Sequence, residues 1–282
     1  MRIVILTSET PANVWLVNQL LSQHEVVGMV LERRPLALTT EEKQERRRRM
    51  AQRHGLARTF NKLLYNKIRS RFLANSEAMA VKEQFFPGGT PITYALSVPI
   101  QVVGNINDAE CIDFIKHHSP DILAVCGTTV IRPEVFTLAP KGAINIHTGI
   151  TPEYRSADPI FWALYSGEPE KVGVTIHVID QGIDTGPIIH QDTVPVYADD
   201  TLATIYTRCI QRGAELYSRA LAEIAEGSVR TVQRDGAENR AFRSIDLGIV
   251  QYLMFRLRFR RMARSLPRGD TAAARSASEA KR

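Results

Sequence analysis

The chain has 282 residues, of which 44% are hydrophobic and 23% charged, an ordinary globular composition with enough length for a full core. Its longest apolar runs, at 26–31 and 122–126, are far shorter than the roughly 20 residues of a membrane-spanning helix. Three cysteines lie far apart without a CxxC pair, so we expect neither a disulfide framework nor a cysteine zinc site. The N-terminus lacks a signal-peptide pattern, which predicts a cytoplasmic protein.

The net charge of +6 is unevenly distributed along the chain. Residues 33–71 hold 13 Lys or Arg against three acids, and residues 256–282 hold nine against two, so the remainder is acidic. Two such basic segments can attract nucleic acid, an anionic membrane surface or an anionic substrate. The alternative interpretation is a pair of solvated helix faces with a frayed tail.

The chain begins with a β-α-β pattern, followed by a basic insert. Residues 1–7 and 25–31 resemble buried strands and 12–22 an amphipathic helix, which predicts a parallel sheet. Residues from about 34 to 86 are Arg-rich and helical in propensity, and Pro87-Gly88-Gly89 ends this insert. Within it, the apolar residues that recur at helical spacing and are expected to pack are Leu56, Phe60, Leu63, Leu64 and Ile68.

Strand and helix patterns then alternate. Strands are expected at 100–103, 121–126, 143–147, 172–179 and 187–194. Helices are expected at 108–117, 133–138, 158–166 and, after an Asp199-Asp200 cap, at 200–226. The predicted fold class is α/β: a Rossmann-like open, mostly parallel sheet with helices on both faces, a helical insert and a C-terminal helical appendage.

The last predicted element is a basic amphipathic helix at 249–266. The apolar stripe on one of its faces consists of Tyr252, Phe255, Phe259 and Met262. Arginines 256, 260, 261 and 264 lie off that stripe. Such a helix packs its aromatic stripe on its own domain, or it lies on a membrane surface or a partner.

Polar side chains end the strand at 143–147 and follow it in the chain. Asn145 and His147 are two residues apart and therefore share one face of the strand, at the sheet edge where ligands bind in open parallel sheets. Asp184 lies in a glycine-flanked loop that can fold back on this edge. Imidazole can move a proton, amide can donate to an oxyanion, and carboxylate can orient the imidazole and hold a water. Gly-x-Ser-x-Gly is absent, so direct attack by a substrate amine is favoured over an acyl-enzyme.

These residues belong to a longer string of motifs. In chain order the string is Asn145-x-His147, Pro152-x-Tyr154-Arg155, Trp162-Ala163, Gly173-Val174-Thr175-x-His177 and Asp184-x-Gly186-x-Ile188. It closely resembles the formyltransferase family, whose members use 10-formyltetrahydrofolate and include glycinamide ribonucleotide, methionyl-tRNA and nucleotide-sugar formyltransferases. The resemblance is strong over 105–196 and only topological over 1–31.

The resemblance implies a catalytic trio. His147 would be the general acid/base, Asn145 would stabilise the tetrahedral oxyanion, and Asp184 would position His147 and a proton-shuttling water. It also implies a formyltransferase catalytic domain over 1–230, with the basic helix and a flexible tail over 231–282. It argues against a metal triad of His147, His177 and Asp184. His177 is expected to be structural, or to contact the catalytic residues without touching the substrate.

The resemblance also implies which residues bind the two substrates. The residues expected to bind the donor 10-formyltetrahydrofolate, largely through backbone groups, are Thr129, Val130, Ile131, Asp180, Gln181, Gly182 and Ile183. The residues expected to bind the acceptor are Thr151, Pro152, Tyr154 and Arg155.

The sequence departs from the family at three places. Ser156 stands where the family usually has Gly, which predicts strain if that position needs a positive φ. Residues 148–151, Thr-Gly-Ile-Thr, replace the commoner Pro-Ser-Leu-Leu and alter the acceptor pocket. The insert at about 34–86 is not part of the family core.

The acceptor is predicted by elimination. The segment 7–11 has no glycine and one acid, unlike the phosphate loop of glycinamide ribonucleotide enzymes. The 55 residues after Gly227 are too few for the C-terminal barrel of methionyl-tRNA enzymes. We therefore expect a primary amine on a small molecule, first a nucleotide-linked amino sugar; nucleic acid is not favoured, and peripheral membrane contact through 249–266 stays open. The alternatives are the other two transferases, a 10-formyltetrahydrofolate hydrolase and a non-catalytic folate- or partner-binding protein.

Overall fold

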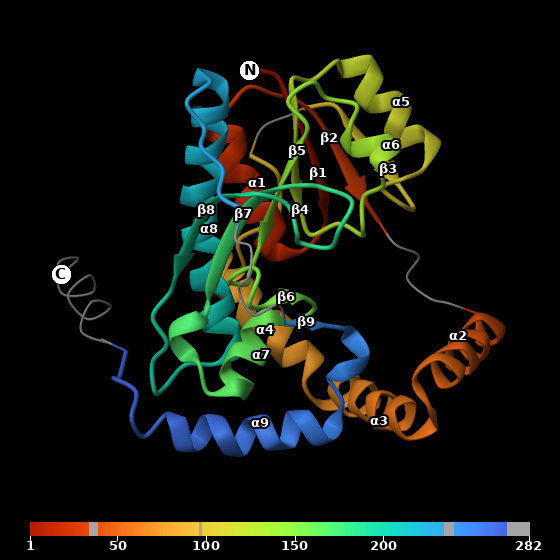
Figure 1. Cartoon of the computed structure of the whole chain (residues 1–282), viewed down its shortest axis with the longest axis vertical. Helices are drawn as coiled ribbons and strands as arrows, with labels where there is room; N and C mark the ends of the chain where they lie inside the picture. Colours follow the sequence, from red (N-terminus) through yellow and green to blue (C-terminus); the bar gives the residue numbers. More distant parts are fainter. Residues whose placement is uncertain (34–38, 96–97, 234–239, 270–282) are drawn as a thin grey trace.

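The computed structural model describes residues 1–33, 39–95, 98–233 and 240–269. A seven-stranded sheet with the order β3-β2-β1-β4-β5-β7-β8 lies at its centre (Figure 1). Its strands are β1 (Ile3–Ser8), β2 (Val26–Glu32), β3 (Ile100–Val103), β4 (Ile122–Cys126), β5 (Ala143–His147), β7 (Gly173–Val178) and β8 (Ile188–Thr193). The first five pair in parallel, and β7 runs antiparallel to both β5 and β8. The predicted open, mostly parallel sheet is confirmed.

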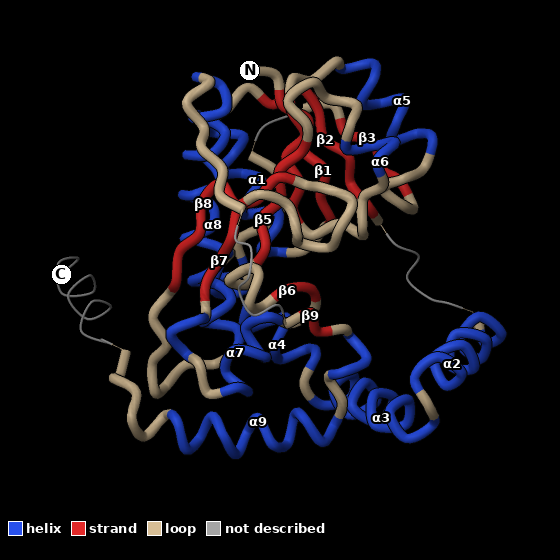
Figure 2. The backbone as a smooth tube through the Cα atoms, in the orientation of Figure 1, coloured by secondary structure: helices blue, strands red, loops and turns tan. Residues whose placement is uncertain are grey.

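Helices cover both faces of this sheet (Figures 1 and 2). The helices on one face are α1 (Pro11–Gln23) and α8 (Leu202–Glu226), and those on the other are α5 (Ala109–His118) and α6 (Pro133–Phe136). Strand β1 faces both layers: Ile3 and Ile5 belong to one apolar cluster, and Val4 and Leu6 belong to the other. This alternation follows from the two-residue period of a strand that is buried on both sides.

The ends of the covering helices follow from capping side chains. The Thr10 hydroxyl accepts a hydrogen bond from the Asn13 N–H at the start of α1. Helix α8 begins after Thr201, which forms a capping box with Thr204, so the predicted Asp199-Asp200 cap is off by one residue. Asp200 instead accepts hydrogen bonds from Arg208, about two turns further along the helix.

The basic insert is helical, as predicted. It consists of α2 (Thr40–His54), α3 (Leu56–Phe72), α4 (Ala74–Phe85) and a short 3-10 turn, η1 (Pro87–Gly89). The α2 helix starts at a capping box formed by Thr39 and Glu42. The four consecutive arginines, residues 46–49, are exposed on α2.

The packing face predicted for α3 is wrong at two positions. Leu56 is 79% exposed and Phe60 69% exposed, whereas the buried residues of α3 are Thr59, Lys62 and Tyr65. The face of α3 is set by polar contacts with the C-terminal helix, such as the 2.9 Å hydrogen bond from Asn61 Nδ2 to Gln251 Oε1. The spacing of apolar residues does not predict such polar contacts between α3 and the C-terminal helix, which we call the polar seam.

The C-terminal helix packs through its aromatic stripe on the rest of the chain. The elements involved are β6 (Arg155–Ser156), α7 (Pro159–Ser166), η2 (Pro169–Lys171), β9 (Ala241–Phe242), η3 (Ser244–Asp246) and α9 (Ile249–Met262). The Phe255 ring lies 4.8 Å from that of Phe161, and the Tyr252 ring 5.6 Å from that of Tyr65. The predicted internal packing of the stripe is confirmed. The flexible tail predicted beyond it falls mostly outside the described residues.

We predict that Phe255→Ala destabilises the protein, whereas Leu257→Ala does not. Phe255 is buried in the cluster beneath α9 and Leu257 is exposed on the opposite side. Truncating a buried Phe costs about 3–5 kcal/mol, so the free energy of unfolding measured with urea should fall by that order. Equal and small effects of the two substitutions would show that α9 is not packed as described.

Candidate active site

A cavity of about 570 Å³ lies beyond the carboxyl ends of β4 and β5. Its position matches the rule for open α/β sheets, since the chain runs from β1 outward to β3 and then returns to place β4 on the other side of β1. Its lining comes from β4 and the loop after it (Val125 and residues 127–131), from β5 (residues 145–147), from Ala157, and from β7 and the loop after it (residues 177, 179, 180 and 182–184). All three predicted catalytic residues are among them.

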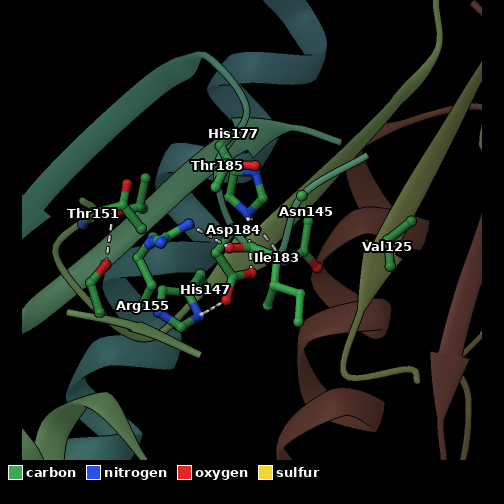
Figure 3. A network of polar contacts seen from close by, with 12 residues as sticks. Val125, Asn145, His147, Thr151, Arg155, His177, Ile183, Asp184 and Thr185 are labelled. Atoms are coloured by element: carbon green, nitrogen blue, oxygen red, sulfur yellow. Dashed lines mark hydrogen bonds and ion pairs between the residues drawn. The ribbon is translucent and has the colours of Figure 1, made fainter. Parts of the chain in front are cut away.

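The carboxylate of Asp184 lies between two imidazoles (Figure 3). Its Oδ2 is 3.5 Å from His147 Nδ1, and its Oδ1 is 3.5 Å from His177 Nε2. The Asp184 backbone is left-handed, with φ at 52°, a conformation that Asp adopts more readily than most residues. The loop therefore turns this side chain back toward the end of β5, as the sequence predicted.

The hydrogen bonds of His147 define which of its nitrogens is available. Nε2 lies 3.0 Å from the carbonyl oxygen of Tyr154, and because a carbonyl only accepts, Nε2 carries a proton. Nδ1, which faces Asp184, is then the nitrogen that can gain or lose one. The side chain is only 8% exposed, and this burial lowers its pKa below 6.5, with Asp184 acting in the opposite direction.

His177 sets the orientation of Asn145. The two residues are directly opposite each other in the antiparallel pair of β5 and β7. His177 Nδ1 lies 2.9 Å from the carbonyl oxygen of Val178 and therefore donates to it. Its Nε2 is then an acceptor for the Asn145 amide nitrogen at 3.2 Å. One amide N–H of Asn145 is held by this bond, and the other is available to a ligand in the cavity.

Two residues fix the shape of the loop that carries Asp184. Asp180 Oδ1 accepts hydrogen bonds from the Gly182 N–H at 3.0 Å and from the Thr185 hydroxyl at 2.6 Å. A Cβ on Gly186 would lie 1.8 Å from the carbonyl oxygen of Val178, so glycine is required there. Asp180, Gly182 and Ile183 line the cavity, whereas Gln181 is exposed at the turn.

The opposite wall of the cavity is held by a buried acid that the sequence interpretation missed. Glu32, at the end of β2, accepts hydrogen bonds from the Thr129 N–H at 2.8 Å and from its hydroxyl at 2.5 Å. It also accepts one from the Ile106 N–H. The signal was an acid at the carboxyl end of an otherwise apolar strand; nothing in the sequence pairs it with Thr129.

The two predicted donor-binding segments lie on opposite sides of the cavity and suit a flat ring. Thr129, Val130 and Ile131 line one side. Val130 is 64% exposed, and Ile183 on the other side is 52% exposed. Two exposed apolar side chains that face one cavity favour a ligand with an apolar or aromatic body. The pterin part of a folate fits this description.

The predicted acceptor-binding residues do not lie together on one open surface. Thr151 and Tyr154 are buried, and the Tyr154 hydroxyl donates to Glu168 Oε2 at 2.6 Å, so the contribution of Tyr154 to the site is its carbonyl. Pro152 is half-buried after a cis peptide bond. Arg155 Nη1 donates to the carbonyl of Ile183 at 3.2 Å and ties this segment to the loop of Asp184.

The backbone is not strained at Ser156, where the family usually has glycine. Among the described residues, the non-glycine residues with left-handed backbone are Ser119, Asp158 and Asp184. The backbone of Ser156 is part of strand β6. The described ranges also contain no group of three or more His, Cys, Asp or Glu side chains arranged to hold a metal ion.

Comparisons with known proteins identify what this geometry resembles. A family model described as Formyl transferase matches residues 1–221, which extends the similarity to the first strand. The methionyl-tRNA formyltransferase of Pelotomaculum thermopropionicum is 34% identical over 149 residues, covering 52% of this chain and 47% of that protein. The enzyme of the same name from Chlorobium chlorochromatii is 31% identical over 141 residues, with 50% and 45% coverage. The chain thus spans about half the length of the curated relatives it matches.

Solved structures show the same fold at low sequence identity. A phosphoribosylglycinamide formyltransferase from Anaplasma phagocytophilum aligns with a TM-score of 0.53 and 20% identity, covering 83% of this chain and 96% of that one. A 4-N formyltransferase from Francisella tularensis aligns with a TM-score of 0.54 and 14% identity, with 91% and 87% coverage. At these identities the similarity establishes the fold.

We predict that Asp184→Asn lowers the pKa of His147 further, because the negative charge that raises it is removed. A histidine proton titration followed by NMR should place the wild-type value below 6.5 and the variant value lower still. Since the folded pKa is below that of the unfolded chain, protonation of His147 reduces stability as pH falls below 6.5. Asp192→Asn, on the exposed edge strand β8, is the control, and an unchanged His147 pKa in Asp184→Asn would contradict the geometry.

Proposed function

The chain belongs to the formyl transferase family, and we propose that it transfers a formyl group from 10-formyltetrahydrofolate to a primary amine of a small-molecule acceptor. The observation that carries the proposal is the buried His147–Asp184 pair, 3.5 Å apart, in a cavity with Asn145. A proton carrier, a carboxylate and an amide donor are the groups that acyl transfer to an amine requires. No nucleophilic side chain is needed when the amine attacks directly.

The proposed roles follow from the hydrogen bonds of each side chain. His147 Nδ1 takes a proton from the attacking amine and returns one to the leaving nitrogen, while Tyr154 holds Nε2. Asp184 stabilises the imidazolium that forms between these transfers. The free N–H of Asn145, oriented by His177, donates to the oxygen on which negative charge develops. When bound, the donor supplies an activated formyl carbon.

The proposed donor site is the space between the two loops that carry Thr129–Ile131 and Asp180–Ile183. Glu32, which is buried, and Asp180, which lines the cavity, accept hydrogen bonds from these loops and hold their backbone groups in place for a ligand. Val130 and Ile183 supply apolar contacts from opposite sides. Such preformed sites keep the entropy cost of binding low.

We propose an amino sugar attached to a nucleotide as the acceptor. The loop after β1 carries Glu9, which is paired with Arg33 at 2.9 Å; a negative side chain there disfavours a phosphate in that loop. Methionyl-tRNA, glycinamide ribonucleotide and water are the competing acceptors, and a folate-binding protein without turnover is the competing function of another class. One assay separates all of them.

We predict that His147→Ala lowers formyl transfer by about 10²- to 10⁴-fold, the usual contribution of a general acid/base. The assay follows the absorbance of tetrahydrofolate formed from 10-formyltetrahydrofolate, with and without a panel of amines that includes nucleotide-linked amino sugars. His117→Ala, an exposed histidine on α5, is the matched control and should retain full activity.

Each alternative has its own outcome in this assay. Formate release without any amine, lost in His147→Ala, would identify a hydrolase. Turnover with methionyl-tRNA or glycinamide ribonucleotide but not with amino sugars would replace the proposed acceptor. Folate binding without turnover of any acceptor would contradict the proposed catalysis.

We further propose that the outer face of α9 rests on an anionic membrane surface. The exposed apolar residues of α9, spaced at i, i+3, i+4 and i+7, are Val250, Leu253, Met254 and Leu257. Arg261 continues this stripe, and Arg256 and Arg260 flank it. Apolar residues in such a basic setting are typical of helices that lie in the headgroup region. In the described part of the chain, no helix is long and apolar enough to cross a membrane.

We predict that the protein sediments with vesicles containing phosphatidylserine and that Leu253→Asp with Leu257→Asp abolishes this binding. Both side chains are exposed, so folding should be unaffected. Met79→Asp, an exposed apolar residue on α4, is the matched control. Binding that persists in the double variant, or that is equal on phosphatidylcholine alone, would contradict the proposed surface.

A further inference from the structure

A second cavity, of about 680 Å³, lies where the insert meets the rest of the protein. Its walls come from α2, α3 and α4 on one side and from α7, α8 and residues 244–247 on the other. Thr148, the residue after His147, lines it, and so does Asp158, which caps α7. This cavity therefore approaches the catalytic histidine from the side of the segment 148–158, whereas the first cavity holds the two donor loops.

A buried lysine faces this cavity and, in the described part of the chain, forms no direct ion pair. Lys62 is 8% exposed, and among the described residues it has no hydrogen bond or ion pair. Its ammonium lies 5.2 Å from the centre of the Tyr65 ring. Burial lowers its pKa, and the attraction of Asp158 opposes this only in part. A buried cation of this kind is costly unless a ligand supplies the counter-charge.

The other charges around the cavity leave an excess of positive charge. Arg69 is matched by Glu77, with 2.8 Å between them. Arg46 lines the cavity from α2 and, within the described ranges, forms no ion pair. Asp158, the remaining acid in the lining, attracts Lys62, so Arg46 and Lys62 together exceed the acids by one positive charge. The chemistry of the lining therefore favours an anionic ligand.

We infer that this cavity holds a phosphate or diphosphate group of the acceptor on Lys62 and Arg46, an inference that rests on the proposed formyl transfer. The volume is typical of small-molecule sites, about 300–1,000 Å³, and too small for a folded nucleic acid. The aromatic rings of Tyr65, Phe161 and Tyr206 in the lining suit the organic part attached to the phosphate. The amine end then reaches His147 past Thr148.

This assignment gives the insert a role in acceptor binding. Five of the lining residues named here, Arg46, Lys62, Tyr65, Arg69 and Glu77, belong to the insert. Two carriers share the chemistry required: a nucleotide diphosphate and a polyprenyl phosphate of the membrane. Both would present phosphate to Lys62, and they differ in what they present to the aromatic rings.

The test is calorimetric titration of the full chain with UDP, with geranyl diphosphate and with inorganic pyrophosphate. We expect UDP or geranyl diphosphate to bind and Lys62→Gln to weaken that binding about ten- to a hundredfold, the value of a lost hydrogen bond to a charged group. Lys67→Gln is the matched control, since Lys67 is exposed on the same helix and is not part of the lining. Tighter binding of UDP than of pyrophosphate supports a nucleotide carrier, and tighter binding of geranyl diphosphate supports a lipid carrier.

A second pair of variants tests the phosphate site in case Lys62→Gln does not fold. Arg46→Gln should weaken the same ligand, whereas its neighbour Arg47→Gln should not; both arginines are exposed on α2, so neither substitution disturbs a core. Absence of binding to wild type, or equal losses in each variant and its control, would overturn the inference.

The phosphate site and the proposed formyl transfer can fail independently, and the results distinguish the two cases. Formyl transfer to an amine with an unchanged KM in Lys62→Gln would leave the transferase intact and overturn the phosphate site. Binding that depends on Lys62, without formyl transfer to any amine, would support the phosphate site and overturn the proposed catalysis.

Discussion

The site depends on one carboxylate, that of Asp184, held between two imidazoles. A buried histidine favours its neutral form, and the nearby carboxylate opposes this tendency without removing it. His147 therefore remains a base at neutral pH while its conjugate acid has a counter-charge 3.5 Å away. The second imidazole, His177, also contacts the Asn145 amide through Nε2, the nitrogen that lies near Asp184, while its Nδ1 donates to the carbonyl oxygen of Val178. In the proposed mechanism, proton transfer and oxyanion stabilisation are thus coupled through the side chain of Asp184.

Elements outside the cavity hold the carboxylate of Asp184 in position. Asp184 comes from a loop, and loops are held by what anchors their ends. Here the anchors are the antiparallel strands β7 and β8, the Asp180 turn, and a glycine at 186 that lets the chain pass close to Val178. On the opposite wall, Glu32 does the same for Thr129. Both sides of the cavity are therefore held by hydrogen bonds within the protein.

The sequence predicted much of this and failed at identifiable places. Strand periodicity located the sheet, and the spacing of Asn145 and His147 placed them on one face, because both depend on local chain geometry. The role of His177 depends on the register between β5 and β7, and that of Glu32 on a contact across 97 positions. The exposed positions of Leu56 and Phe60 depend on a polar seam between α3 and α9. Contacts between distant segments leave no periodic trace in a single sequence.

The basic residues of the insert fall into two groups that composition alone could not separate. Its net charge reflects many arginines that point into solvent, such as residues 47–49 of α2. A smaller set faces the second cavity, and there Lys62 is buried and forms no ion pair with any residue that the structure describes. Exposed cations cost little and mainly affect solubility and long-range attraction, whereas a buried one lowers stability unless a ligand compensates. In the inferred phosphate site, the position of Lys62, rather than the number of basic residues, is therefore what would connect the insert to the acceptor.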